Sequence, residues 1–395
     1  MSALAMLHAR VSDVVDQVRV AHETRTPLRI AAGDTWRNAG RPVATPHDVL
    51  DLGALSGVVE YVPGDLVLTV GAATTLAEID AVTAPHGQWI GLDPFGSESG
   101  TVGATVATAS VGPLSQAYGA PRDQLLGLEY VAGDGTVATG GGRVVKNVAG
   151  FDVVRLHCGA WGTLGALTSV SLRCFARPAV DDTIALPFPE AAHAHVELLD
   201  SLRTAAIAPL AAVLLDGAAA RHLGLPDTPH VVLRLGGNPA SVRAQRAACD
   251  ALGRVHVVEG TPWSRIRALD GDAIAVARVS ARPATLVALW QNVTSLLRTH
   301  GVADAEVRRV ALLDRGVLRV AIDRASEVTL TTLIARLAPP GGAVRWERLP
   351  AGCWPFVQSG VDDALSRRVR LAFDPHQLLN RGILGEPRVP AAHTG

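Results

Sequence analysis

Glycine is concentrated in one part of this chain. The segment from Gly87 to Gly165 holds 17 of the 39 glycines in the 395-residue sequence, far more than an even spread would place there. Glycine adopts backbone angles that other residues avoid, and it lets a ligand or another backbone approach closely. We therefore predict that this segment consists of tight turns and loops, some of which hold a ligand through their backbone.

Three loops have the small-residue composition that suits phosphate binding, because inward-pointing backbone N–H groups in such loops bind nucleotide phosphates. A single loop of this kind is more often a structural turn, but three of them together predict a nucleotide site. At Gly103 we expect a side chain to fill space that a pyrophosphate needs. The loops are Ala32-Gly33-Asp34-Thr35, which follows a predicted strand over 27–31; Gly100-Thr101-Val102-Gly103-Ala104, with Gly112 beyond it; and the segment 159–168, which contains Gly162, Leu164 and Gly165.

Two common nucleotide-binding motifs are excluded. A P-loop requires Gly-Lys followed by Ser or Thr, but the only lysine of the chain is Lys146, and Val145 precedes it. A dinucleotide-binding Rossmann motif requires G-x-G-x-x-G between a strand and a helix, and none of the three loops has that spacing. The nucleotide must therefore be bound by another type of fold.

Lys146 stands out because all 35 other basic side chains of the Lys and Arg type are arginine. It lies in the segment Lys146-Asn147-Val148-Ala149-Gly150-Phe151-Asp152. A compact ammonium group and a planar guanidinium are not interchangeable where a point charge is needed. We therefore predict a functional role for Lys146 and Asn147; the alternative is a lysine on a solvated loop.

The distribution of strand-like and helix-like runs predicts more than one domain. An amphipathic helix is predicted over 1–19, and a strand over 66–71 precedes a helix capped by Thr75 and Glu78. From about Asp181 to Leu349 strands and helices alternate, which is typical of an α+β domain. Proline-containing segments near Pro178 and Pro339 mark the breaks. We expect domains over 1–178 and 179–350, followed by a C-terminal tail, 351–395.

Composition excludes several classes of protein. A net charge of -1 gives no reason to expect nucleic acid or an anionic membrane as partner, and no apolar stretch reaches the roughly 18 residues of a membrane span. The N-terminal residues lack the layout of a secretory signal, so we expect a cytoplasmic protein. Four cysteines without a C-x-x-C pair argue against a zinc or iron–sulfur site. His193 and His195 do not share a helix face, so we interpret them as surface residues and expect no metal.

The three loops and the tail 373–382, which includes Asn380, resemble the flavoprotein family typified by vanillyl-alcohol oxidase and p-cresol methylhydroxylase. Within that family the chain is most similar to the FAD-binding subunits of bacterial glycolate oxidases. The most specific similarity is the segment 146–152. Further similar elements are Thr26-Pro27-Leu28, Gly40-Arg41-Pro42, Arg122-Asp123 and Arg177-Pro178.

The resemblance implies an α+β fold with a two-subdomain FAD-binding domain of the p-cresol methylhydroxylase type and a smaller α+β cap domain. It also implies that the C-terminal tail, 351–395, returns to the FAD-binding domain. The FAD pyrophosphate would lie along 32–35 and 100–103, and the loop 162–167 would contact the adenine side. Arg122, Asp123 and Asn380 are further cofactor-binding candidates, while Lys146 and Asn147 would lie near the flavin or a substrate carboxylate. Asp34 replaces a histidine that attaches FAD in some relatives, so noncovalent FAD is expected.

The resemblance also implies a function. The chain is expected to be the FAD-binding subunit of a complex that oxidises glycolate or another small 2-hydroxy acid, with a larger flavoprotein and an iron–sulfur protein as partners. These partners could hold it at the inner face of the membrane. The His-rich metal-binding element of catalytic relatives is missing from the second domain. Two alternatives stay open: a self-sufficient FAD-dependent oxidoreductase acting on another hydroxy acid or a sugar derivative, and a non-catalytic assembly subunit.

Overall fold

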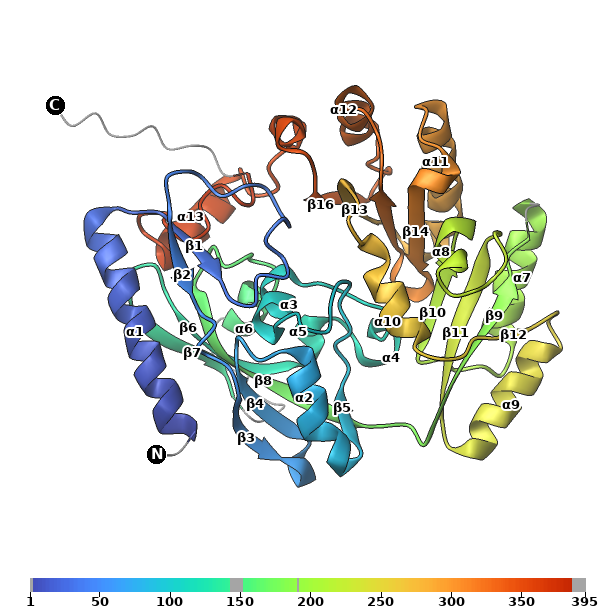
Figure 1. The fold of residues 1–395 in the computed structure, drawn as a ribbon, viewed down its shortest axis with the longest axis horizontal. Coiled ribbons are helices and arrows are strands. Elements are labelled where there is room, and N and C mark those ends of the chain that lie inside the picture. Colours follow the sequence, from blue (N-terminus) through green and yellow to red (C-terminus); the bar gives the residue numbers. More distant parts are fainter. Residues whose placement is uncertain (1–2, 143–151, 190–191, 386–395) are drawn as a thin grey trace.

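The computed structural model describes residues 3–142, 152–189 and 192–385. The chain forms two regions that lie side by side (Figure 1): the first region, residues 3–176, and the second region, residues 180–357. A short C-terminal segment, residues 364–385, packs back on the first region. Over the described ranges, no helix is long and apolar enough to cross a membrane.

The first region contains a parallel pair of strands, β1 and β2, and a six-stranded antiparallel sheet in the order β3-β4-β8-β6-β7, in which β5 also pairs with β8. The long central strand β8 joins the sheet together. The strands are β1 Leu28–Ala31, β2 Asp48–Asp51, β3 Val58–Val62, β4 Val67–Gly71, β5 Gln88–Ile90, β6 Leu125–Val131, β7 Val137–Gly141 and β8 Ala166–Ala176; the helices are α1 Ala3–Thr24, α2 Leu76–Thr83, α3 Val102–Thr108, α4 Ser115–Tyr118, α5 Pro121–Gln124 and α6 Val153–His157.

Local sequence signals of the first region are confirmed. Helix α1 buries one apolar stripe that includes Val11, Val14 and Val18, as its spacing predicts. Helix α2 begins with a capping box, in which the Glu78 N–H donates to Thr75 Oγ1 (3.1 Å) and the Thr75 N–H donates to Glu78 Oε2 (2.7 Å). Strands β6 and β7 pair antiparallel, as the glycine-rich turn between them predicts.

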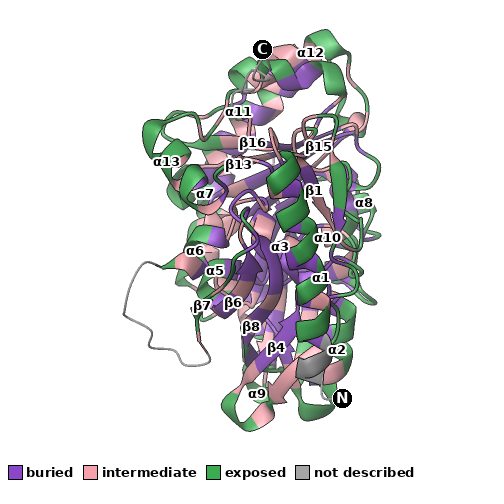
Figure 2. Cartoon of the chain, turned by 90° about the vertical axis from the view of Figure 1, so that its left-hand side faces the viewer, coloured by how far each residue is buried: buried purple, intermediate pink, exposed green. Residues whose placement is uncertain are grey.

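The second region is built on an eight-stranded antiparallel sheet in the order β12-β9-β11-β10-β14-β15-β13-β16. Helices α7, α9, α11 and α12 cover one face of this sheet (Figure 1). The side chains between these helices and the sheet form the largest apolar core of the described residues. Figure 2 shows buried residues in the strands of both regions. The strands are β9 Val180–Pro187, β10 Ala211–Leu215, β11 His230–Gly237, β12 His256–Val257, β13 Ala275–Ser280, β14 Val307–Leu312, β15 Val317–Ile322 and β16 Ala343–Arg348; the helices are α7 Ala192–Thr204, α8 Gly217–Arg221, α9 Pro239–Asp250, α10 Pro262–Arg267, α11 Leu286–Thr299 and α12 Glu327–Arg336.

The interpretation of His195 as a surface residue is wrong. Its side chain is buried, its ring stacks on Phe188 with the ring centroids 4.3 Å apart, and Gln291 lies within hydrogen-bonding distance of Nδ1 (3.2 Å). A spacing of two residues could not show which face of α7 packs on the sheet. His195 is a core residue with polar partners.

The C-terminal segment forms the second partner of strand β1, beside β2. After helix α13 (Ala364–Phe373), the Leu28 N–H donates to the Leu378 carbonyl (2.9 Å) and the Asn380 N–H donates to the Leu28 carbonyl (2.8 Å). The fully buried Asp374 fixes this turn, because its Oδ2 accepts from the Leu379 N–H (2.8 Å) and pairs with Arg370. The end of the chain thereby reaches the same place as the first predicted phosphate loop.

Candidate functional site

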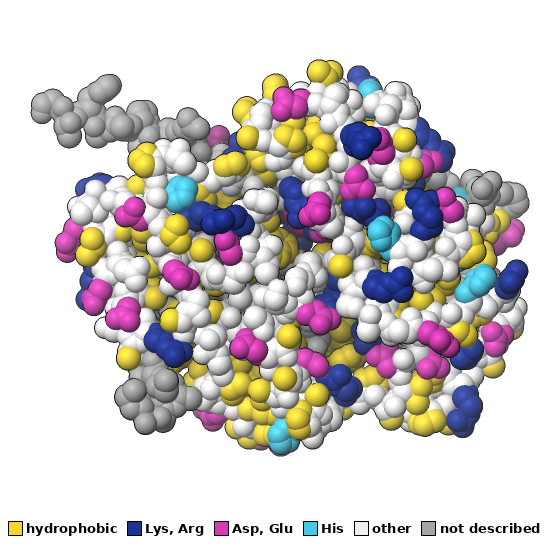
Figure 3. Space-filling view, in the orientation of Figure 1, with side chains coloured by type: hydrophobic (Ala, Val, Ile, Leu, Met, Phe, Trp, Pro, Cys, Tyr) yellow, Lys and Arg dark blue, Asp and Glu magenta, His cyan; other side chains and the backbone are white. Residues whose placement is uncertain are grey.

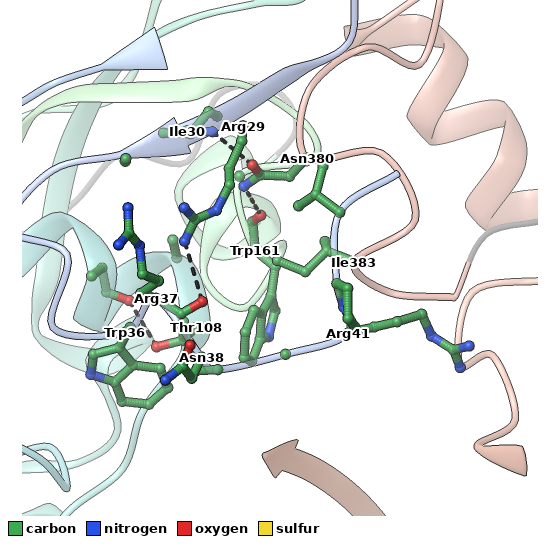
Figure 4. A pocket seen from close by; sticks show the side chains of 18 of the residues that line it. Arg29, Ile30, Trp36, Arg37, Asn38, Arg41, Thr108, Trp161, Asn380 and Ile383 are labelled. Carbon is green, nitrogen blue, oxygen red and sulfur yellow. Dashed lines mark hydrogen bonds between the residues drawn. The ribbon is translucent and has the colours of Figure 1, made fainter. Parts of the chain in front are cut away.

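A cavity of about 800 Å³ lies between the two regions. The first region contributes the end of β1, the loop that follows it, helix α3 and the turn before β8, while the second region contributes Ile274 and the segment 348–354. Asn380 and Ile383 of the C-terminal segment complete the wall (Figure 4). The space-filling view shows the surface hollowed in the middle, between the regions, with charged side chains around the hollow (Figure 3). The volume suits a large organic ligand.

The three small-residue loops meet at this cavity. A Cβ built on Gly33 of the first loop would lie 3.3 Å from Thr101 Cγ2 of the second, so these two loops touch. A Cβ built on Gly162 of the third loop would lie 2.8 Å from the Asn380 Nδ2 and 3.1 Å from Ile30 Cδ1. Residues far apart in the sequence therefore surround the end of strand β1.

Asn380 ties this arrangement together. Its Oδ1 accepts from the Ile30 N–H (2.8 Å), and its Nδ2 donates to the Trp161 carbonyl (2.8 Å; Figure 4). Its φ of 45° lies in the left-handed region, which asparagine tolerates better than most residues. One side chain thus fixes both the first strand and the third loop at the cavity wall.

The first loop presents unpaired backbone donors. Within the described part of the chain, the N–H groups of 32–35 donate to no protein acceptor, and the loop is largely exposed. Asp34 has φ 56°, and a left-handed residue in such a loop turns successive N–H groups toward one side. This geometry suits an anion such as a phosphate group.

The charges around the cavity agree with an anionic ligand. Among the described residues that line it there are four arginines and no aspartate or glutamate. Arg29 donates to the Arg37 carbonyl (3.2 Å), and both guanidinium groups lie near Asp34, with Arg37 Nε 2.9 Å from Oδ2. The other two arginines that line the cavity are Arg41 and Arg348. Sequence reasoning did not find Arg29 and Arg37, because among 35 arginines nothing marks those that lie beside a loop of free N–H groups.

Aromatic side chains form the remaining walls. Trp36 and Trp161 pack edge to face with their ring centroids 6.3 Å apart, and Trp354 adds a third indole from the second region. The Trp161 Nε1 is buried and has no hydrogen-bond partner among the described residues. The cavity therefore combines anion-binding backbone at one place with flat apolar surfaces and an available donor, which is the combination that a dinucleotide with planar rings needs.

Comparison with known proteins identifies the ligand. Residues 3–141 match a family described as FAD binding domain. This chain carries an FAD-binding domain. The unpaired N–H group of Ala32, which lines the cavity, and the N–H groups of 33–35 beside it fit the pyrophosphate of FAD together with Arg29 and Arg37. The indoles of Trp36, Trp161 and Trp354 fit its rings.

Solved structures show that the whole chain has the p-cresol methylhydroxylase type of fold. A p-cresol methylhydroxylase with substrate bound superposes with a TM-score of 0.70 at 17% identity, covering 95% of this chain and 87% of that one. An alkyldihydroxyacetonephosphate synthase gives a TM-score of 0.67 at 18% identity, covering 94% of this chain and 75% of that one. The predicted α+β fold, an FAD-binding domain followed by a second α+β unit, is confirmed.

Curated relatives are named as oxidoreductases of hydroxy acids. Glycolate oxidase subunit GlcE of Escherichia coli is 37% identical over 167 residues, which are 42% of this chain and 47% of that subunit. D-lactate dehydrogenase of Archaeoglobus fulgidus is 24% identical over 400 residues, 92% of this chain and 87% of that enzyme. Glycolate oxidase subunit GlcD of Bacillus subtilis is 25% identical over 236 residues, 58% of this chain and 50% of that subunit. The similarity thus spans only about half the length of both glycolate oxidase subunits.

The predicted site residues fall into groups. One group lines the FAD cavity: Ala32, Thr101, Gly103, Ala104, Gly162, Gly165 and Asn380. A second group, Asp34 and Thr35, lines an adjoining cavity of about 610 Å³ between the first loop and the second region. The remaining described candidates do not line the FAD cavity: Gly33, Gly100, Val102, Gly112, Arg122, Asp123 and Leu164. Lys146 and Asn147 lie outside the described residues, and their role stays a prediction.

Two of the predicted glycines are required for packing within the protein. A Cβ on Gly103 would lie 2.7 Å from the Ala72 carbonyl oxygen, so glycine lets helix α3 approach the chain after β4. This packing reason adds to the pyrophosphate space that the sequence suggested, which stays a prediction because Gly103 also lines the cavity. A Cβ on Gly112 would lie only 1.7 Å from the Asp93 carbonyl oxygen, so Gly112 packs against that strand-to-helix loop instead of a ligand.

Arg122 and Asp123 are at the surface of the short helix α5. Asp123 Oδ2 accepts from the Ala120 N–H (2.9 Å), which caps that helix, and Arg122 lies 3.7 Å from Asp123 Oδ1 with two thirds of its side chain exposed. Asp123 therefore has a local structural role as a helix cap, and a cofactor-binding role for the two residues stays a prediction.

Proposed function

We propose that the chain is the FAD-binding subunit of a complex that oxidises glycolate or a closely related 2-hydroxy acid, and that it binds FAD noncovalently. The observation that carries the proposal is the FAD-type cavity closed by arginines and aromatic residues from both regions. The names of the relatives, a glycolate oxidase subunit and a D-lactate dehydrogenase, support the substrate class.

The roles of the residues follow from their chemistry. When bound, FAD supplies a two-electron acceptor for the carbon that bears the hydroxyl group, and the product is the 2-oxo acid. The N–H groups of 32–35, with Arg29 and Arg37, hold the pyrophosphate, and Asn380 keeps strand β1 and the Trp161 turn in place. The second region closes the cavity with Trp354 and so keeps water from the bound rings.

Noncovalent binding is supported by the cavity lining. Of the described residues that line it, none is cysteine or tyrosine, and His47 is the one histidine. The His47 Nδ1 lies 3.2 Å from the Ala44 carbonyl, so this ring is engaged by its own loop. Flavin retained in an acid precipitate of the wild type, and released in His47→Ala, would contradict this part of the proposal.

Glycolate-dependent dye reduction tests the subunit role. The chain is assayed alone, and again after co-expression with a candidate large flavoprotein and a candidate iron–sulfur protein. We expect FAD in the isolated chain and dye reduction only in the complex. Full activity of the isolated chain would instead support a self-sufficient oxidoreductase. A complex whose activity persists when this chain has lost FAD would support an assembly subunit.

A further inference from the structure

The eight-stranded sheet has one face that is half apolar and half charged. Where this face is formed by β9, β10, β11 and β14, buried apolar side chains pack against α8 and α10 and against Phe95 of the first region. At the other end, strands β15, β13 and β16 direct charged side chains to the same side, while their alternate residues, such as Val279 and Trp346, enter the apolar core on the opposite face. Charged side chains on a sheet face inside a protein are costly unless other groups or a ligand balance their charge.

Three arginines form one row across these strands. Arg278 of β13 is directly opposite Arg319 of β15 on one side and Arg345 of β16 on the other. Directly opposed side chains have Cβ atoms about 5 Å apart, and like charges at that spacing repel each other. The row therefore requires anions close by.

Two carboxylates balance part of this charge. Asp270 accepts two hydrogen bonds from Arg319, from Nε to Oδ1 (2.7 Å) and from Nη2 to Oδ2 (2.5 Å). Glu347 lies 2.7 Å from Arg319 Nη1 through Oε2 and 3.5 Å from Arg278 Nε through Oε1. Three guanidinium groups and two carboxylates give this cluster a charge of about +1 at neutral pH.

The excess charge is on Arg345. Its guanidinium forms no ion pair or hydrogen bond with any described residue, and its side chain reaches solvent. The surrounding protein nevertheless removes enough water to lower the pKa of Arg345, and the neighbouring Arg278 adds to that effect. An anion that displaced water from this guanidinium would gain both hydrogen bonds and relief from the Arg278 charge.

Arg345 lies beside the FAD cavity. Its guanidinium carbon is 5.9 Å from the centre of the Trp161 ring, and Trp161 lines the cavity. In Figure 4 this ring points away from Asn380, which holds the Trp161 carbonyl. Arg278 donates to the Ala109 carbonyl at the end of α3 (3.0 Å), and the Gly40 N–H donates to the Glu347 carbonyl (2.7 Å). Arg278 of the row and the neighbouring Glu347 are therefore each hydrogen-bonded to the first region.

We infer that Arg345 binds the carboxylate group of a small 2-hydroxy acid substrate in the cleft between the two regions, with Arg278 and Glu347 as positioning residues. The inference rests on the proposed function for the substrate class. A planar guanidinium matches a carboxylate with two parallel hydrogen bonds, which gives orientation as well as affinity. The Trp161 indole beside it offers an apolar wall for the rest of a short substrate.

Titration of the purified FAD-containing chain with glycolate and with the inert dicarboxylate oxalate tests this site. Binding is followed by the flavin absorbance change and by calorimetry. Loss of one charge-assisted pair of hydrogen bonds should raise Kd about 30- to 100-fold in Arg345→Gln, with FAD content unchanged. Arg345→Lys should recover part of the affinity, since it restores charge without the planar fork. The control is Arg282→Gln, an exposed arginine of the same region that forms no ion pair in the described chain.

The outcomes separate this site from the cofactor site. An unchanged Kd in Arg345→Gln, or wild-type protein that binds neither carboxylate, overturns the inference while the FAD proposal stands. Loss of FAD from Arg345→Gln also overturns it, because Arg345 would then serve the cofactor. If the wild type holds no FAD, the proposed function fails, and calorimetry with oxalate on the same chain still decides whether Arg345 binds a carboxylate.

Discussion

The two regions build their parts of the site from different material. In the first region the cavity is formed mainly by backbone: the loop that begins at Ala32, with its unpaired N–H groups, and the close approaches at Gly103 and Gly162. Asn380 of the C-terminal segment adds a side chain that bonds to main-chain groups. The second region lines this cavity with side chains such as Arg348 and Trp354, and its ion-paired side chains, such as Arg319 and Glu347, line the adjoining cavity.

The difference has a physical cause. A phosphate group is bound well by backbone N–H groups, and glycine allows the turns that present them. The cofactor-binding loops can therefore be recognised from the high glycine content of the sequence. Binding by side chains requires charges that converge in space, and their cost of burial is offset by partners that can be distant in sequence. Such a site has no local motif.

The largest effect is expected where the backbone of the first region is closest packed. In Gly103→Val the added side chain meets the Ala72 carbonyl at less than contact distance, so helix α3 must move and the second loop with it. We expect little folded protein and FAD content below about one tenth of the wild-type value. Gly64→Val is the matched control, because a Cβ there has no atom within 4 Å. Normal FAD content in Gly103→Val would show that the backbone tolerates the shift.

The second region should be most sensitive to loss of a buried charge. Arg319 is 5% exposed, and Arg319→Met leaves the Asp270 and Glu347 carboxylates without their main partner, which typically costs about 3–5 kcal/mol in the free energy of unfolding. Arg298→Met removes a partner of Asp304 in an exposed pair, and should cost less than about 1 kcal/mol. Urea unfolding gives the free energy of unfolding of both variants and of the wild type. Equal losses in the two variants would contradict the claim that the buried cluster stabilises the second region more than an exposed ion pair does.

A smaller effect is expected at the join between β1 and the C-terminal segment. Asn380→Ala removes one acceptor for the Ile30 N–H and one donor to the Trp161 carbonyl, and should cost about 2–3 kcal/mol of stability. Because both bonds hold the cavity wall, we also expect weaker FAD binding, measured by fluorescence titration of the apoprotein. Asn292→Ala, at an exposed position of α11, should change neither quantity.

The smallest effect concerns pH. Burial raises the pKa of Asp93 to about 7, although Arg267 acts in the opposite direction. The folded state therefore keeps a proton that the unfolded chain releases at lower pH, so stability contributed here falls as pH rises from about 4 to 7. The increase in Tm of Asp93→Asn over wild type should be larger at pH 8 than at pH 5, because the amide cannot ionise. Asp65→Asn, at an exposed position, is the control, and a pH-independent difference for Asp93→Asn would reject this assignment.

The same contrast between backbone and side chains explains what could be predicted from the sequence. The three loops and the capping box at Thr75 depend on local residue types, and they could be recognised there, whereas the return of the tail near Asn380 is expected from the family resemblance. The close approach of Gly103 to Ala72, the core position of His195 and the row formed by Arg278, Arg319 and Arg345 depend on packing and strand register. Register between strands separated by many residues is not visible in one sequence.

The flavin content of the purified chain tests the central claim most directly. The protein is precipitated with acid, and the flavin in the supernatant is identified and quantified by chromatography against FAD and FMN standards. The cavity, with its arginines and the loop of free N–H groups that begins at Ala32, predicts close to one FAD per chain in the supernatant and none in the pellet. A colourless protein that also fails to bind added FAD would contradict the claim that this cavity is a functional FAD site.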